Sequence, residues 1–391
     1  MPRSSAAAET NVRAQSLADG PLGEILVHIE RAHNGTGAWH QIHSALTGIT
    51  RHALMATTDA SLFVGAPAVA FVLHTADAGT GRYAAPLQAL DGQIADLTQV
   101  RLDRAHARID RRERPRVAEF DLLYGLTGLG TYLLLRNPTG RLLRDVLEYL
   151  VRLTEPLPGD PDRLPGWWTE HGPRGGISAD FPGGHANLGM AHGISGPLAL
   201  MARALRCGVS VGGQAEGVNG ICAWLDTWRH DGPSGTGSWW PQWITREEVA
   251  AGRSHQQGPL RLSWCYGTPG LARAQQLAAL AVGDIQRQDK AEHALAHCLS
   301  DRRQLARLTN TGLCHGWAGL FQTSWRAAHD ARTSEIGAHL PYLTDHVVAH
   351  SRPVHERGCG FLDGDAGLDL ALHTAARTTP PVSGWDACLL I

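Results

Sequence analysis

A short glycine motif recurs along this chain and limits its fold more strongly than any other feature. Each copy consists of Gly-x-x-Gly and opens an apolar run of helical length. Copies begin at Gly125, Gly193, Gly267, Gly316 and Gly364, with a degenerate copy at Gly65. Successive first glycines lie between 48 residues (Gly316 to Gly364) and 74 residues (Gly193 to Gly267) apart, which is room for two helices and their connections. A series of stacked helical hairpins is therefore expected.

The segments between the copies are amphipathic. The clearest helical candidates are 140–156, 217–230, 290–301 and 335–350. From Leu142 to Leu153 the leucines and Val146 recur at helical spacing and form one apolar stripe. The runs that follow the glycines are instead apolar on nearly every side, as in a buried helix. These two patterns predict an all-α fold, an α/α toroid in which the Gly-initiated helices form an inner ring and the amphipathic helices an outer ring.

One toroid domain is expected to span residues 21–391. Residues 1–20 are polar and rich in alanine and serine, which predicts a mobile N-terminal tail, and they lack the apolar stretch of a secretion signal. Two segments, 155–186 and 229–261, interrupt the repeat and are rich in glycine, proline and tryptophan. Two interpretations of them stay open, because such rings either pack over one face of the toroid or bind a substrate chain.

Charge and cysteine content narrow the class of function. The 35 Lys+Arg residues nearly balance the 37 Asp+Glu residues, so nucleic acid is not an expected partner. No apolar run is long enough to span a bilayer. Seven widely spread cysteines in a chain of this size are typical of a reduced, cytoplasmic protein.

The repeat also supplies a register for comparing its units. The two residues before the first glycine are apolar in the early units, but they include His192, Cys265, Cys314 and His315 in the third to fifth units. If the inner helices start at one height, these side chains meet at one end of the toroid. Two thiolates and one imidazole suit a single Zn²⁺ ion with an open fourth position, so Cys265, Cys314 and His315 are the predicted metal ligands. The alternative is a pair of buried cysteines that act as small apolar residues; Cys359 is the nearest rival ligand.

The ligand types indicate the chemistry. Two thiolates neutralise the dication, which favours holding an incoming thiol as a thiolate over activating water. His192 is a candidate general acid, oriented by Asp121, and Arg261 is a cation suited to a developing enolate oxygen. Simpler roles remain open, since Asp121 also suits a helix cap and Arg261 a solvated charge. Tyr266 is a further polar residue in this register.

Three motifs in this order resemble the LanC-like family of free-standing class I lanthipeptide cyclases. They are Asn187–Gly193 (NLGMAHG), Trp264–Gly267 (WCYG) and Cys314–Gly316 (CHG), followed by Gly384-Trp385. The resemblance implies a toroid of seven units and one zinc ion on Cys265, Cys314 and His315. It also implies the addition of substrate cysteine thiolates to dehydroalanine or dehydrobutyrine, which forms lanthionine or methyllanthionine thioethers. By position, His192, Asp121 and Arg261 match the residues that manage protons and the enolate, and Tyr266 matches the family's tyrosine.

The resemblance further implies particular partners. They are a dehydrated precursor peptide, a separate dehydratase, since no region of that size is present, and a transient membrane-associated biosynthetic complex. Two other functions remain open for such a chain. It either adds glutathione to dehydrated residues, as a LanC-like enzyme, or serves as a non-catalytic scaffold for a dehydratase or precursor.

Overall fold

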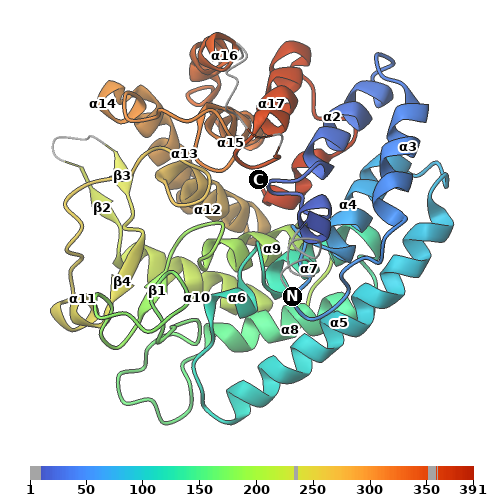
Figure 1. Cartoon of the computed structure of the whole chain (residues 1–391). Coiled ribbons are helices and arrows are strands. Elements are labelled where there is room, and N and C mark those ends of the chain that lie inside the picture. Colours follow the sequence, from blue (N-terminus) through green and yellow to red (C-terminus); the bar gives the residue numbers. More distant parts are fainter. Residues whose placement is uncertain (1–9, 233–236, 351–357, 359) are drawn as a thin grey trace.

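The computed structural model describes residues 10–232, 237–350, 358 and 360–391, and it consists of two concentric rings of helices (Figure 1). The inner ring contains α2 (Leu22–His33), α4 (Ala66–Asp77), α7 (Leu126–Arg136), α9 (Ser195–Arg206), α12 (Thr268–Val282), α15 (Trp317–Asp330) and α17 (Asp365–Arg377). Each of these helices contacts the next, and α17 contacts α2, so the ring closes. The predicted all-α toroid is confirmed.

The outer ring covers the inner helices with amphipathic ones. It contains α3 (Trp39–Thr50), α5 (Ala84–Asp110), α8 (Arg141–Thr154), α10 (Gln214–Thr227), α13 (Ile285–Ser300) and α16 (Leu340–Ala349). Shorter helices are α6 (Val117–Phe120), α11 (Arg246–Ala251), α14 (Arg302–Leu305), η2 (Gly337–His339) and η3 (Trp385–Leu389). Helix α8 buries the stripe from Leu143 to Leu153, as its spacing predicts, while Leu142 is half-buried.

The first inner helix corrects the expected N-terminal tail. Helix α2 starts within Gly20-Pro21-Leu22-Gly23, which is a seventh copy of the motif. The residues before it are packed, since Leu17 is fully buried and its N–H donates to the carbonyl of Phe63 at 2.8 Å. A Cβ on Gly23 would lie 2.7 Å from the backbone nitrogen of Phe361, so this unit packs closely on the last one. The predicted tail therefore includes residues that belong to the ring; residues 1–9 lie outside the described part.

Main-chain hydrogen bonds join the segments that precede the inner helices. The N–H donors and carbonyl acceptors are Leu17 to Phe63, Leu122 to Ala191, Met190 to Cys265, Cys265 to Cys314, Cys314 to Leu362 and Leu362 to Ala18, at 2.8 to 3.2 Å. Every acceptor stands two positions before the first glycine of its unit. We call the seven residues at this position the rim: Ala18, Phe63, Leu123, Ala191, Cys265, Cys314 and Leu362. These bonds hold rim residues at one height, which is why the repeat register predicts neighbours in space.

In the units of Gly267 and Gly316, the second glycine of the motif lets the inner helix fold back over its own rim segment. A Cβ on Gly270 would lie 1.9 Å from the carbonyl oxygen of Trp264, and one on Gly319 would lie 1.8 Å from that of Leu313. Both carbonyls belong to residues directly before a rim cysteine. Close backbone approach at these glycines thus fixes where Cys265 and Cys314 stand.

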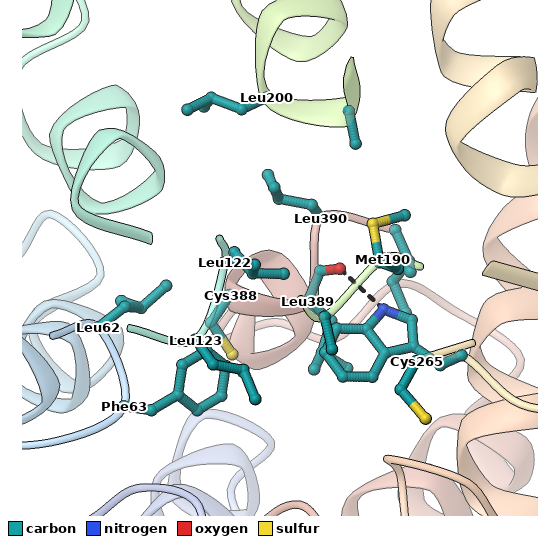
Figure 2. Close-up of a cluster of buried hydrophobic side chains, with 14 of the residues drawn as sticks. Leu62, Phe63, Leu122, Leu123, Met190, Leu200, Cys265, Cys388, Leu389 and Leu390 are labelled. Carbon is teal, nitrogen blue, oxygen red and sulfur yellow. Dashed lines mark hydrogen bonds between the residues drawn. The ribbon is translucent and has the colours of Figure 1, made fainter. Parts of the chain in front are cut away.

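Residues 385–391 fill the middle of the ring. Trp385, Leu389 and Leu390 are buried, and the indole of Trp264 donates to the carbonyl of Leu389 at 3.0 Å. Figure 2 shows Leu389 and Leu390 in one apolar cluster with Cys265 at its edge. This packing supports the part of the rim that includes Cys265.

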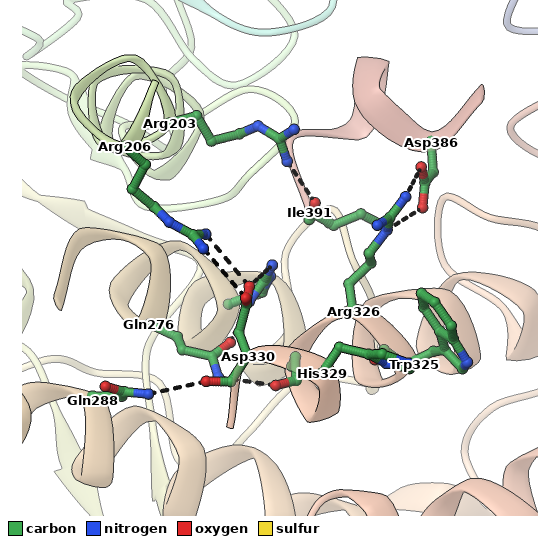
Figure 3. Close-up of polar contacts among 12 residues, drawn as sticks. Arg203, Arg206, Gln276, Gln288, Trp325, Arg326, His329, Asp330, Asp386 and Ile391 are labelled. Carbon is green, nitrogen blue, oxygen red and sulfur yellow. Dashed lines mark hydrogen bonds and ion pairs between the residues drawn. The ribbon is translucent and has the colours of Figure 1, made fainter. Parts of the chain in front are cut away.

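Charged groups tie the far ends of the inner helices together (Figure 3). Asp330, at the end of α15, accepts from Arg273 at 2.7 Å and from Arg206 at 3.3 Å, and Asp386 pairs with Arg326 at 2.6 Å. A 12-residue helix such as α9 is about 18 Å long, so this network lies well away from the rim.

The two tryptophan-rich segments pack on each other beside the ring. Strand β1 (His185–Asn187) pairs antiparallel with β4 (Trp243–Thr245), and β2 (His230–Asp231) pairs with β3 (Ser238–Trp239). Four of the tryptophans in or beside these segments are buried, which favours the packing interpretation for them: Trp167, Trp168, Trp228 and Trp240. Within the described ranges, no helix combines the length and apolarity needed to cross a bilayer.

Candidate metal centre and acid–base pair

The three predicted ligands meet at the rim. One ligand atom from each of Cys265, Cys314 and His315 lies within 4.8 Å of the others. Two atoms bound to a tetrahedral zinc ion at about 2.0–2.3 Å lie about 3.5–3.8 Å apart, so small side-chain movements give the coordination geometry. Cys265 is buried, whereas Cys314 and His315 are half-buried, which leaves one side of the group open. The residues present fit a zinc ion with a free fourth position.

The two thiols share one negative charge. Their hydrogen bond lowers the pKa of Cys265 well below its usual range, with His315 adding to this effect, and it raises the pKa of Cys314. A second thiolate is unfavourable beside the first unless a cation offsets the repulsion. A dication between the sulfurs supplies that offset, which makes the pair suited to a metal.

His192 and Asp121 form the predicted pair one unit along the rim. The Nδ1 atom of His192 lies 2.6 Å from Oδ2 of Asp121, whose side chain is fully buried. The other carboxylate oxygen accepts from the backbone N–H of Tyr124 at 2.7 Å, so both oxygens of Asp121 are held. The Tyr124 ring stacks on His192 with 5.6 Å between centroids. Asp121 therefore orients the imidazole, and the Nε2 atom has no hydrogen-bond partner among the described residues.

Arg261 and Tyr266 line a cavity over the metal ligands. Its volume is about 380 Å³, and Cys265 and Ser263 also line it. Arg261 is exposed and, within the described ranges, has no ion-pair partner. Burial raises the pKa of Tyr266, so its hydroxyl stays protonated at neutral pH. The cavity is thus lined by a cationic side chain, a phenol and Cys265.

Comparison with known proteins shows the family of the chain. The sequence profile of the family described as lanthionine synthetase C-like protein matches residues 11–390. The chain belongs to this family. Nisin biosynthesis protein NisC of Lactococcus lactis subsp. lactis is 24% identical over 261 residues, which is 65% of this chain and 60% of that protein. The solved structure of nisin cyclase has the same fold, with a TM-score of 0.82, 21% identity and coverage of 99% of this chain and 95% of that chain.

In this lanthionine synthetase C-like chain, two polar side chains contact the imidazole of His315. The Nδ1 atom of His315 lies 3.4 Å from Oδ1 of Asp363, and Nε2 lies 3.2 Å from the amide nitrogen of Asn310. A metal-bound imidazole uses one nitrogen for the ion and the other for such a partner. Sequence reasoning missed Asn310, although the register contains a signal. Asn310 and Asn187 both stand six residues before a first glycine and accept the N–H two residues later.

His185, a neighbour of the NLGMAHG motif in this lanthionine synthetase C-like chain, belongs to the packed loops. It is fully buried against Phe181 and Trp243, and its Nδ1 atom contacts the carbonyl of His171 at 2.9 Å. Burial lowers the pKa of His185 to about 4, so the ring is neutral at pH 7. The rival ligand Cys359 lies outside the described residues.

Proposed function

We propose that this protein is a zinc-dependent cyclase that forms lanthionine and methyllanthionine rings in a dehydrated precursor peptide. The observation that carries the proposal is the meeting of Cys265, Cys314 and His315 within 4.8 Å, beside the His192–Asp121 pair. Membership of the family and similarity to nisin biosynthesis protein NisC support it. The glutathione and scaffold functions remain as outcomes of the test below.

Cys265, Cys314 and His315 would hold the zinc ion. A zinc ion there supplies the Lewis acidity that keeps an incoming thiol deprotonated at neutral pH, where a free thiol of pKa about 8.5 is mostly protonated. The two protein thiolates, one of them already favoured at Cys265, keep the centre soft and electron-rich. Cys265 also lines the cavity that Arg261 and Tyr266 line.

The addition moves electrons from sulfur toward a carbonyl oxygen. The substrate thiolate forms a C–S bond to the β-carbon of dehydroalanine or dehydrobutyrine, while the alkene π pair shifts to give an enolate. In this proposal Arg261 stabilises the negative oxygen, and Tyr266, which lines the same cavity, adds a phenolic O–H donor.

His192 then completes the reaction by protonating the enolate. Its Nε2–H delivers a proton to the α-carbon of the enolate, which restores the carbonyl and yields the thioether. Asp121 stabilises the imidazolium before transfer and fixes its orientation afterwards. The proton lost from the substrate thiol balances the one added at carbon, so the cyclised peptide is an isomer of its substrate.

The substrate chemistry implies the partners. A separate dehydratase must supply dehydrated serine and threonine residues, and a membrane-associated complex of the two enzymes would pass the peptide between them. Reduced thiols at the metal centre suit the cytoplasm.

The test uses a dehydrated peptide with one cysteine, incubated with the zinc-loaded protein and then alkylated. A cyclase gives a product of unchanged mass that resists alkylation. Adding glutathione tests the second function, because its adduct carries the extra mass of one tripeptide. A scaffold binds the peptide and gives neither product. Cys265→Ala is expected to abolish both zinc content and ring closure, and full activity without metal would refute the proposal.

A further inference from the structure

The rim carries two different chemistries at structurally equivalent positions. In the units of Gly267 and Gly316 the rim residue is a cysteine, and in the unit of Gly193 it is Ala191, with His192 next to it. The other rim residues are apolar: Ala18, Phe63, Leu123 and Leu362, of which Ala18, Phe63 and Leu362 accept the same main-chain bonds. Closure of the ring uses only the main-chain atoms of the rim residues. The difference between their side chains therefore reflects function and not folding.

The apolar part of the rim lines a large cavity near the site. Its volume is about 800 Å³, and its walls include Phe63, Val64, Leu123, Tyr124 and Leu362. Among the described residues that line it, none comes from the units that carry the metal ligands or His192. Charged side chains also line it, at Arg13, Asp19 and Asp363.

Two residues of this cavity wall contact residues of the proposed reaction site. Tyr124 forms part of its wall and stacks on His192 at 5.6 Å. On the other side, Asp363 lines the cavity and lies 3.4 Å from Nδ1 of His315. A peptide whose thiol lies at the metal and whose alkene lies near His192 thus has the cavity beside both reacting ends.

We propose that the apolar cavity binds the apolar side chains of the peptide segment that the forming thioether ring encloses. The inference rests on the proposed function. Intramolecular addition requires the residues between the alkene and the thiol to loop away from the reacting atoms, and this cavity adjoins both ends of that loop. Its volume lies in the range of about 300–1,000 Å³ that holds compact ligands. Burial of apolar side chains against Phe63, Leu123 and Leu362 is favourable, in proportion to the apolar surface removed from water. The cavity therefore selects apolar residues inside the ring.

Binding of unreactive peptides tests the cavity separately from catalysis. Two analogues carry alanine for the dehydroalanine and serine for the cysteine, with either Leu-Leu or Gly-Ser between them. Calorimetry on the zinc-loaded protein is expected to give at least tenfold tighter binding for the Leu-Leu analogue. Val64→Trp fills the cavity and Val64→Ser makes it polar without adding bulk, and both should remove that preference. Ile285→Trp, at an exposed site on α13, should retain it.

The outcomes separate this inference from the proposed function. Equal affinity of the unmodified protein for the two analogues would overturn the inference, even if the reactive peptides cyclise. An affinity difference that survives in both folded Val64 variants, judged by zinc content and thermal unfolding, would overturn it as well. If the preference for Leu-Leu depends on Val64 but neither reactive peptide cyclises, the inference about the cavity is upheld and the proposed cyclase function is wrong.

Discussion

Replacing Asp121 by asparagine tests the acid–base pair most directly. Asparagine keeps the shape, and its carbonyl oxygen still accepts from the N–H of Tyr124, a bond of 2.7 Å in the present structure. The amide NH₂ then faces Nδ1 of His192, which must be unprotonated to accept. An imidazole held in that state cannot carry the second proton that makes it a strong acid. Asp121→Asn should therefore slow proton delivery to the α-carbon.

The size of the effect follows from the geometry. A hydrogen bond to an ionised group contributes about 1.5–3 kcal/mol, and the 2.6 Å contact to a fully buried carboxylate favours the upper half of that range. At about 1.4 kcal/mol per tenfold change in rate, kcat should fall about 30- to 150-fold. The KM for the peptide should change little, because Asp121 is buried and does not reach the substrate.

Single-turnover cyclisation of a dehydrated peptide measures this change, with alkylation resistance as the readout and zinc content as a check on folding. Asp386→Asn is the matched control, since Asp386 is equally buried but pairs with Arg326 far from the rim. It should lower the melting temperature and leave kcat unchanged. If Asp121→Asn cyclises within threefold of the unmodified rate, Asp121 serves only as a cap for the turn at Tyr124 and the proposed pair is wrong.

Three further predictions follow from the ligands, the packed loops and the repeat. Cys265→Ala should weaken zinc binding by about 100-fold or more in a chelator competition. The control Cys222→Ala, at a buried cysteine on α10, should leave zinc binding unchanged. Equal loss of zinc binding in both variants would argue against a specific site. Burial lowers the pKa of His185 from 6.5 to about 4, so the unfolded chain binds this proton first; the stability present above pH 6.5 is lost as the pH falls to 4, by about 3 kcal/mol. Urea unfolding of His185→Gln should lack that component, and an unchanged pH dependence would contradict it. Gly270→Ala should destabilise the fold by about 1–3 kcal/mol, because its Cβ would lie 1.9 Å from a main-chain oxygen. Gly220→Ala, with open space around it in α10, should instead stabilise the fold. A change of the same sign in both variants would refute the close-approach argument.

Sequence periodicity predicts most of the fold for a physical reason. A motif that recurs before each buried helix requires a repeated unit, and the stripe on α8 shows which side faces inward. The seventh copy, Gly20 to Gly23, escapes this reasoning because polar residues precede it. Its burial depends on Phe361, which is more than 300 residues away in the sequence and adjacent only after the ring closes. Composition alone assigns those residues to a tail.

The site was predictable to the extent that the rim positions its residues. Cys265, Cys314 and His192 were expected to be neighbours from register alone, and main-chain hydrogen bonds between rim segments explain why. The stacking of Tyr124 on His192 depends on side-chain rotamers, which carry no period in the sequence. The loops that bury Trp167 and Trp168 were equally unreadable, because their composition suits packing and binding alike.

The division of labour in the motif explains how one scaffold holds this chemistry. The rim bonds use only main-chain atoms, so the side chain two positions before each glycine can change without opening the ring. The glycines cannot change in this way, since a Cβ at Gly319 would overlap the carbonyl oxygen of Leu313. The glycines therefore determine the stability of the fold, and the rim side chains determine its chemistry. A cysteine at one rim position, such as Cys314, and a leucine at the next, Leu362, place a candidate metal ligand beside an apolar wall without any change in the fold.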